Sequence, residues 1–108
     1  MSKTYYKSQI EGYKRDIERE KTKIAGFKED IAKVKIRKSR ATETYANRLR
    51  SASSSSAKHN IRSSKAREWD SFAREIDRYK DRIDACKKDI LRYREAMSRA
   101  REAMKRAK

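Results

Sequence analysis

The sequence has no proline, two glycines, one cysteine and one histidine in 108 residues. Because proline and glycine are the residues that most disfavour helix, their scarcity favours long uninterrupted helices. The single cysteine, Cys86, excludes a disulfide within the chain and a multi-cysteine metal site. The single histidine, His59, has no second histidine or carboxylate at metal-ligand spacing. We therefore expect no metal and no cofactor.

Long apolar runs are also missing. No stretch of about 18 apolar residues could form a membrane span, and the N-terminal Met-Ser-Lys-Thr-Tyr-Tyr lacks the apolar segment of a secretory signal. We therefore expect a cytoplasmic protein, or one exported by a route that does not need a signal peptide. The serine run at residues 51–56 has neither a nucleophile elbow nor a general base, so the sequence does not predict an enzyme.

A heptad pattern of apolar residues runs through most of the chain. Apolar residues recur every seven positions from Ile10 to Ile31 and from Trp69 to Met104. A second series follows each of these, three residues later. Glu20 interrupts the second series of the first segment, and Cys86 belongs to that of the second segment. The residues between are mostly charged, so each helix can bury one narrow stripe. The seam predicted to be buried and to bind a partner consists of Ile10, Tyr13, Ile17, Ile24, Phe27, Ile31, Trp69, Phe72, Ile76, Tyr79, Ile83, Ile90 and Tyr93.

The two stripes are out of phase. Tyr45 and Trp69 are 24 residues apart, three heptads plus three, so one straight rod could not present both stripes to the same neighbour. The serines between them compete with helix, and Asn60 can cap a second helix. The sequence predicts an all-α, coiled-coil-like antiparallel two-helix hairpin over residues 1–108, with helices at about 4–49 and 62–107 and a basic, serine-rich turn at about 50–61.

Such a hairpin has an incomplete core. A two-helix seam leaves aromatic flanks only partly covered, and we expect this of Trp69, Phe72, Tyr79 and Tyr93. Self-association or a helical protein partner would cover them by closing a helical bundle. The sequence therefore favours a non-catalytic helical interaction protein, with the oligomeric state left open between a homodimer and a hetero-complex.

Basic charge is concentrated in the middle of the chain. The net charge is +16, and residues 33–67 hold eleven basic side chains against one acidic side chain, Glu43. Three kinds of partner remain open: an acidic protein, nucleic acid and an anionic membrane surface. The charge would speed the approach of an acidic protein. Apolar residues in this segment are sparse for a face that inserts into a membrane. The aromatic residues lie at seam positions rather than among the basic ones, so no stacking platform for bases is expected. This basic patch consists of Lys33, Lys35, Arg37, Lys38, Arg40, Arg48, Arg50, Lys58, Arg62, Lys65 and Arg67.

The Tyr5-Tyr6 pair and the Trp69-Asp70-Ser71-Phe72 segment support a resemblance to a known family. A chain of about this length, with two antiparallel helices and a tryptophan near the turn, resembles the WXG-motif family of type VII secretion, and especially the small helper proteins that pair with LXG toxins. Ser71 stands where the family motif has glycine. The resemblance implies a non-catalytic partner that binds the helical targeting domain of a secreted toxin. Nucleic-acid binding through the basic turn is the alternative function.

Overall fold

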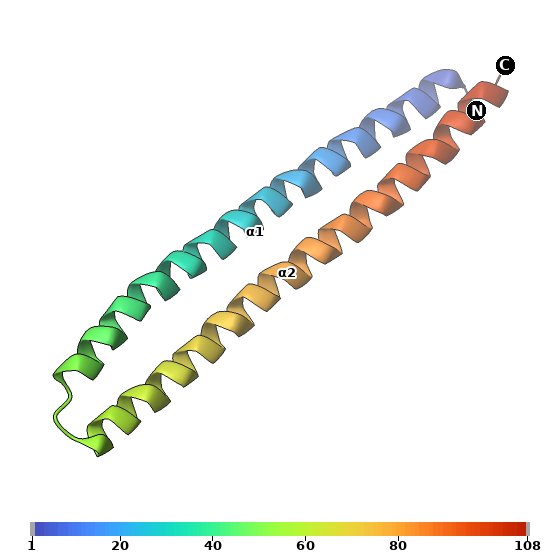
Figure 1. Ribbon diagram of the computed structural model, residues 1–108. Coiled ribbons are helices and arrows are strands. Elements are labelled where there is room, and N and C mark those ends of the chain that lie inside the picture. Colours follow the sequence, from blue (N-terminus) through green and yellow to red (C-terminus); the bar gives the residue numbers. More distant parts are fainter. Residues whose placement is uncertain (1, 108) are drawn as a thin grey trace. The chain divides into compact units, whose positions relative to one another are not determined.

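The computed structural model describes residues 2–107 and contains two α-helices, α1 (Lys3–Ser51) and α2 (Ser55–Arg106) (Figure 1). Long helices are what a proline-free heptad sequence favours, because nothing within either one interrupts the backbone hydrogen bonds. The helices are antiparallel, and no strand occurs among the described residues. The predicted all-α helical hairpin is confirmed. No helix within residues 2–107 is long and apolar enough to cross a membrane.

The contacts divide the chain into two units, each with a segment of both helices. The turn unit is Lys28–Lys80, and the end unit combines Met1–Phe27 with Asp81–Lys108. In the turn unit, Tyr45 of α1 contacts Glu68 of α2. Arg37, which lies earlier in α1, contacts Glu75, which lies later in α2. The residue number falls along α1 as it rises along α2, so the two helices are antiparallel within this unit.

The turn is shorter than the sequence predicts. It comprises residues 52–54, and α2 begins at Ser55 rather than near residue 62. The hydroxyl oxygen of Ser54 accepts a hydrogen bond from the backbone N–H of Ala57 at 3.1 Å, which is the interaction of a helix N-cap. Ser54 is therefore the N-cap of α2. Asn60, which the sequence predicts as the cap, lies inside the helix. The predicted turn at 50–61 is therefore wrong in its extent, although its position between the two helices is correct.

The core of each unit is a single seam along the helices, as the heptads predict. Among residues 2–107, the end unit buries six apolar side chains and the turn unit three. A core this narrow leaves the flanks of the seam accessible to other molecules. The buried apolar side chains are Ile10, Ile17, Ile83, Cys86, Ile90 and Ala100 in the end unit and Val34, Tyr45 and Phe72 in the turn unit.

Candidate functional site

The predicted seam is the hairpin's own core and also its main half-covered surface. All thirteen predicted residues are buried or half-buried, and none is exposed. The buried ones are Ile10, Ile17, Phe72, Ile83 and Ile90. The remaining eight keep more of their surface in contact with solvent, so they offer a second chain the larger contact area. They are Tyr13, Ile24, Phe27, Ile31, Trp69, Ile76, Tyr79 and Tyr93.

Phe72 differs from the other aromatic residues of the seam. Partial coverage is confirmed for Trp69, Tyr79 and Tyr93, but it is wrong for Phe72, of which only 6% is exposed. The Trp69 ring lies edge-on to Phe72, with ring centres 5.8 Å apart, and the guanidinium carbon of Arg37 lies 5.9 Å from the Phe72 ring centre. These two side chains cover the ring, so Phe72 belongs to the core of the turn unit.

Glu20 places a charged group inside the seam of the end unit. It is 4% exposed, and its carboxylate accepts a hydrogen bond from Lys23 Nζ at 3.1 Å. Burial raises the pKa of the neighbouring Cys86 thiol, and a hydrogen bond from that thiol to Glu20 raises it further. The thiol therefore stays protonated at neutral pH and is a poor nucleophile. Cys86 is buried, as its place in the heptad stripe predicts.

The turn unit contains a cluster of three aromatic rings. The rings of Tyr45 and Trp69 lie edge to face with centres 5.9 Å apart, and Trp69 contacts Phe72 in the same way. The Tyr45 hydroxyl donates a hydrogen bond to the Glu68 carboxylate, which raises the pKa of that hydroxyl. Tyr45 and Phe72 are buried and Trp69 is half-buried, so the cluster presents one ring to other molecules.

Cations surround these rings. The ammonium nitrogens of Lys38 and Lys65 lie 5.7 Å and 5.1 Å from the centre of the Trp69 ring, and the Arg48 guanidinium lies 5.2 Å from that of Tyr45. These are cation–π distances. The expectation that the aromatic residues lie apart from the basic ones is therefore wrong. Lys38 and Lys65 continue the heptads of the two helices, which brings both lysines beside the rings.

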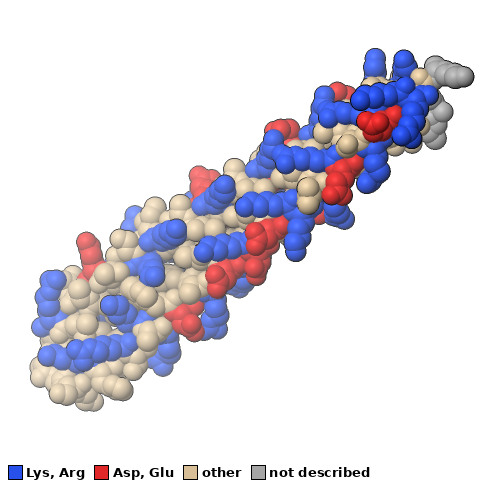
Figure 2. All heavy atoms as spheres, turned by 45° about the vertical axis from the view of Figure 1, so that its right-hand side comes forward, with Lys and Arg blue, Asp and Glu red and all other residues tan. Residues whose placement is uncertain are grey.

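The basic patch lies entirely within the turn unit. Its side chains are exposed except for Lys38 and Lys65, which are half-buried. Around the turn, Figure 2 shows Lys and Arg side chains with few Asp or Glu among them. One carboxylate of this unit, Glu75, is engaged by Arg37 Nη2 at 2.6 Å. Within residues 2–107, neither Lys38 nor Lys65 forms an ion pair, so their charges remain available to an external anion.

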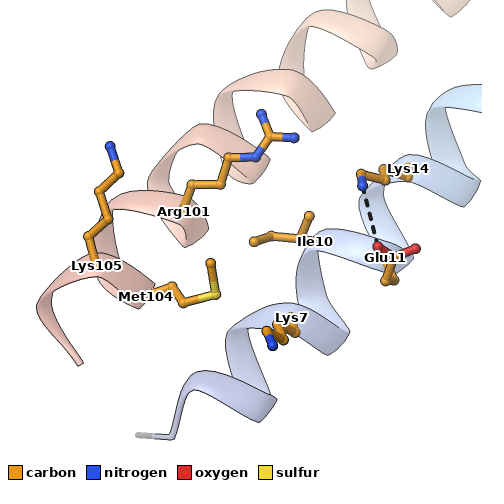
Figure 3. A pocket seen from close by; sticks show the side chains of 7 residues that line it. All are labelled: Lys7, Ile10, Glu11, Lys14, Arg101, Met104 and Lys105. Carbon is orange, nitrogen blue, oxygen red and sulfur yellow. Dashed lines mark hydrogen bonds and ion pairs between the residues drawn. The ribbon is translucent and has the colours of Figure 1, made fainter. Parts of the chain in front are cut away.

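A groove in the end unit has an apolar floor and a charged rim (Figure 3). It has a volume of about 490 Å³. The side chains of Ile10 and Met104 face one another across it. The heptad pattern does not reveal this groove, because its two sides come from opposite ends of the chain and the helix register brings them together. The lining residues are Lys7, Ile10, Glu11 and Lys14 of α1 and Arg101, Met104 and Lys105 of α2.

The geometry of these sites is suited to binding. Within residues 2–107, no group of three or more His, Cys, Asp or Glu side chains is placed to hold a metal ion. What the structure offers instead is a half-covered apolar seam, a cationic aromatic cluster and one charged groove. No family model, curated protein or solved structure matches this chain, so the resemblance to the WXG-motif family stays a prediction.

Proposed function

We propose that this chain is a non-catalytic interaction protein whose seam is completed by a helix of another protein. The observation that carries the proposal is the half-burial of eight seam side chains, among them Trp69, Tyr79 and Tyr93. Large aromatic side chains in the centre of a contact are the usual anchors of binding energy. A third or fourth helix laid along the seam would cover them, as in a helical bundle.

The helical targeting domain of a type VII secreted toxin is the partner that the resemblance suggests. Two features support this proposal: the chain is an antiparallel helical hairpin, and Trp69 of the Trp69-Asp70-Ser71-Phe72 segment lies half-buried in the turn unit. A helper protein of this kind needs no catalytic group, only an apolar seam and charged flanks that fix the orientation of the partner.

Purification from the cells that produce the protein tests this function. In about 1 M salt, where the Debye length is about 3 Å, nucleic acid should be released, whereas a partner held by apolar contacts should remain. We expect a helical protein to co-purify in a fixed ratio, to be lost with Trp69→Ala and to be retained with Leu91→Ala, whose side chain is 58% exposed. A chain that purifies alone, or only with nucleic acid, would contradict the proposal.

One specific observation favours nucleic-acid binding as a second candidate function. Lys38 and Lys65 lie beside the half-buried Trp69 ring without an ion pair among the described residues. Lysines without carboxylate partners release condensed counterions when they contact phosphates, and this release provides affinity for any sequence. The turn unit would then follow the phosphate backbone, with the rings supporting the lysines rather than stacking on bases.

A further inference from the structure

We propose that the groove in the end unit receives the partner helix, and that this helix carries acidic residues beside its apolar ones. The inference rests on the proposed function and names the place and the chemistry of the partner. The groove is the site formed by Ile10 and Met104 at its floor and by charged side chains at its rim.

The spacing of the lining residues fits a helix. On α1 they are residues 7, 10, 11 and 14, and on α2 they are residues 101, 104 and 105. Four residues at i, i+3, i+4 and i+7 form the hole that accepts one apolar side chain of a facing helix in coiled-coil packing. A helix lying in this groove could therefore place its apolar side chains over Ile10 and Met104.

The rim selects for negative charge. It has four cationic side chains and one carboxylate, Glu11, which pairs with Lys14 Nζ at 3.3 Å. Lys105 pairs outside the groove, with Glu102 at 3.5 Å. Lys7 and Arg101 are exposed and form no ion pair within residues 2–107. Carboxylates on either side of the partner's apolar stripe would pair with these two cations.

The same charges disfavour a second copy of this chain as the occupant. A copy would bring another net charge of +16 to a cationic rim, and like charges placed side by side across an interface oppose association. A second hollow of the end unit, of about 260 Å³, is lined by Tyr6, Tyr13 and three alanines, with Arg99 as its only cation among the described lining residues. A third hollow, of about 280 Å³, also has one cation, Arg106, among its described lining residues. The groove, with four cations, is therefore the hollow best suited to select a partner by charge.

Two synthetic helical peptides of four heptads test the proposal against the full-length protein. Both carry leucine at the core positions, with glutamate at the flanking positions in one and lysine in the other. We expect the glutamate peptide to bind about tenfold more tightly than the lysine peptide in moderate salt, as measured by fluorescence anisotropy. Two exposed ion pairs, one with Lys7 and one with Arg101, together contribute about that ratio. Equal affinity for the two peptides, or binding of neither, would overturn the proposal.

A charge exchange locates the binding site. Lys7→Glu with Arg101→Glu should weaken the glutamate peptide about tenfold and strengthen the lysine peptide. The matched control, Arg15→Glu with Lys88→Glu, changes the net charge equally at exposed positions that do not line the groove. Equal effects of the two double variants would overturn the proposal.

The outcomes separate this inference from the proposed function. If a partner co-purifies with the wild-type chain at high salt, but binds the Lys7→Glu and Arg101→Glu variant as tightly as the wild-type chain in moderate salt, the function stands and the groove assignment fails. If no partner co-purifies with the wild-type chain, the function fails whether or not the acidic peptide binds. All four altered side chains are exposed, so both variants are expected to fold. Circular dichroism of each variant checks this.

Discussion

Phe72→Ala is expected to lower the free energy of unfolding by about 3 to 5 kcal/mol. The ring is 6% exposed and packs against Trp69 and Arg37. Removing it deletes apolar contacts and leaves a cavity that a two-helix core has few neighbours to fill. A loss of this size is a large part of the roughly 5 to 15 kcal/mol that stabilises an ordinary domain. Urea denaturation followed by circular dichroism at 222 nm measures it.

Ile36→Ala provides the control within the same unit. Its side chain is 52% exposed, so the substitution should change stability by no more than about 0.5 kcal/mol. Equal effects of the two variants would show that the seam does not carry the stability of the turn unit. The comparison also matters for binding studies, because Trp69 can be replaced to test partner contact, whereas replacing Phe72 would weaken the hairpin itself.

If the turn unit binds nucleic acid, the affinity should fall steeply with salt. The logarithm of the binding constant decreases by about 0.9 per phosphate contact for each unit of log salt, so six to ten contacts lose about 10³ to 10⁵ in affinity between about 50 and 200 mM. Lys38→Ser, Arg40→Ser and Lys65→Ser together should reduce the slope by nearly three. Arg37 is not in this set, because it already pairs with Glu75. Gel retardation across a salt series measures the slope.

A matched triple variant in the end unit controls for net charge. Arg15→Ser, Lys87→Ser and Lys88→Ser remove the same number of cations from exposed positions outside the turn unit. Their effect on the slope should be small, because counterion release depends on the cations that contact phosphate. An equal reduction by both triple variants would indicate binding without a defined site. No retardation of duplex or single strand at low salt would reject the nucleic-acid function.

The hairpin could be predicted from the sequence because heptad periodicity depends on local spacing alone. The phase shift between Tyr45 and Trp69 was enough to infer a reversal of direction. The start of α2 could not be inferred in the same way. Several serines and Asn60 can all cap a helix, and the pattern does not rank them. The choice of Ser54 depends on its hydrogen bond to the Ala57 N–H, which is a property of the folded turn.

The candidate sites were less predictable because they combine residues that are distant in the sequence. Charge alone predicts that Lys38 and Lys65 belong to a surface patch. Both also occupy heptad positions, and these positions place them beside Trp69. The groove requires Ile10 and Met104 to meet, which only the helix register decides. The sequence shows that Glu20 interrupts the seam, but its position does not predict its contacts with Lys23 and Cys86.

Trp69 in the isolated chain gives the most direct test of an incomplete seam. Acrylamide quenching and the emission maximum report the exposure of this single tryptophan, and sedimentation equilibrium at micromolar concentration reports the association state. We expect Trp69 to be partly accessible to the quencher, and its emission to shift to shorter wavelength when a partner helix binds, because the ring is half-buried in the hairpin alone. A cooperatively folded monomer with the emission of a fully buried tryptophan would contradict this expectation, since no part of the ring would then remain for a partner to cover.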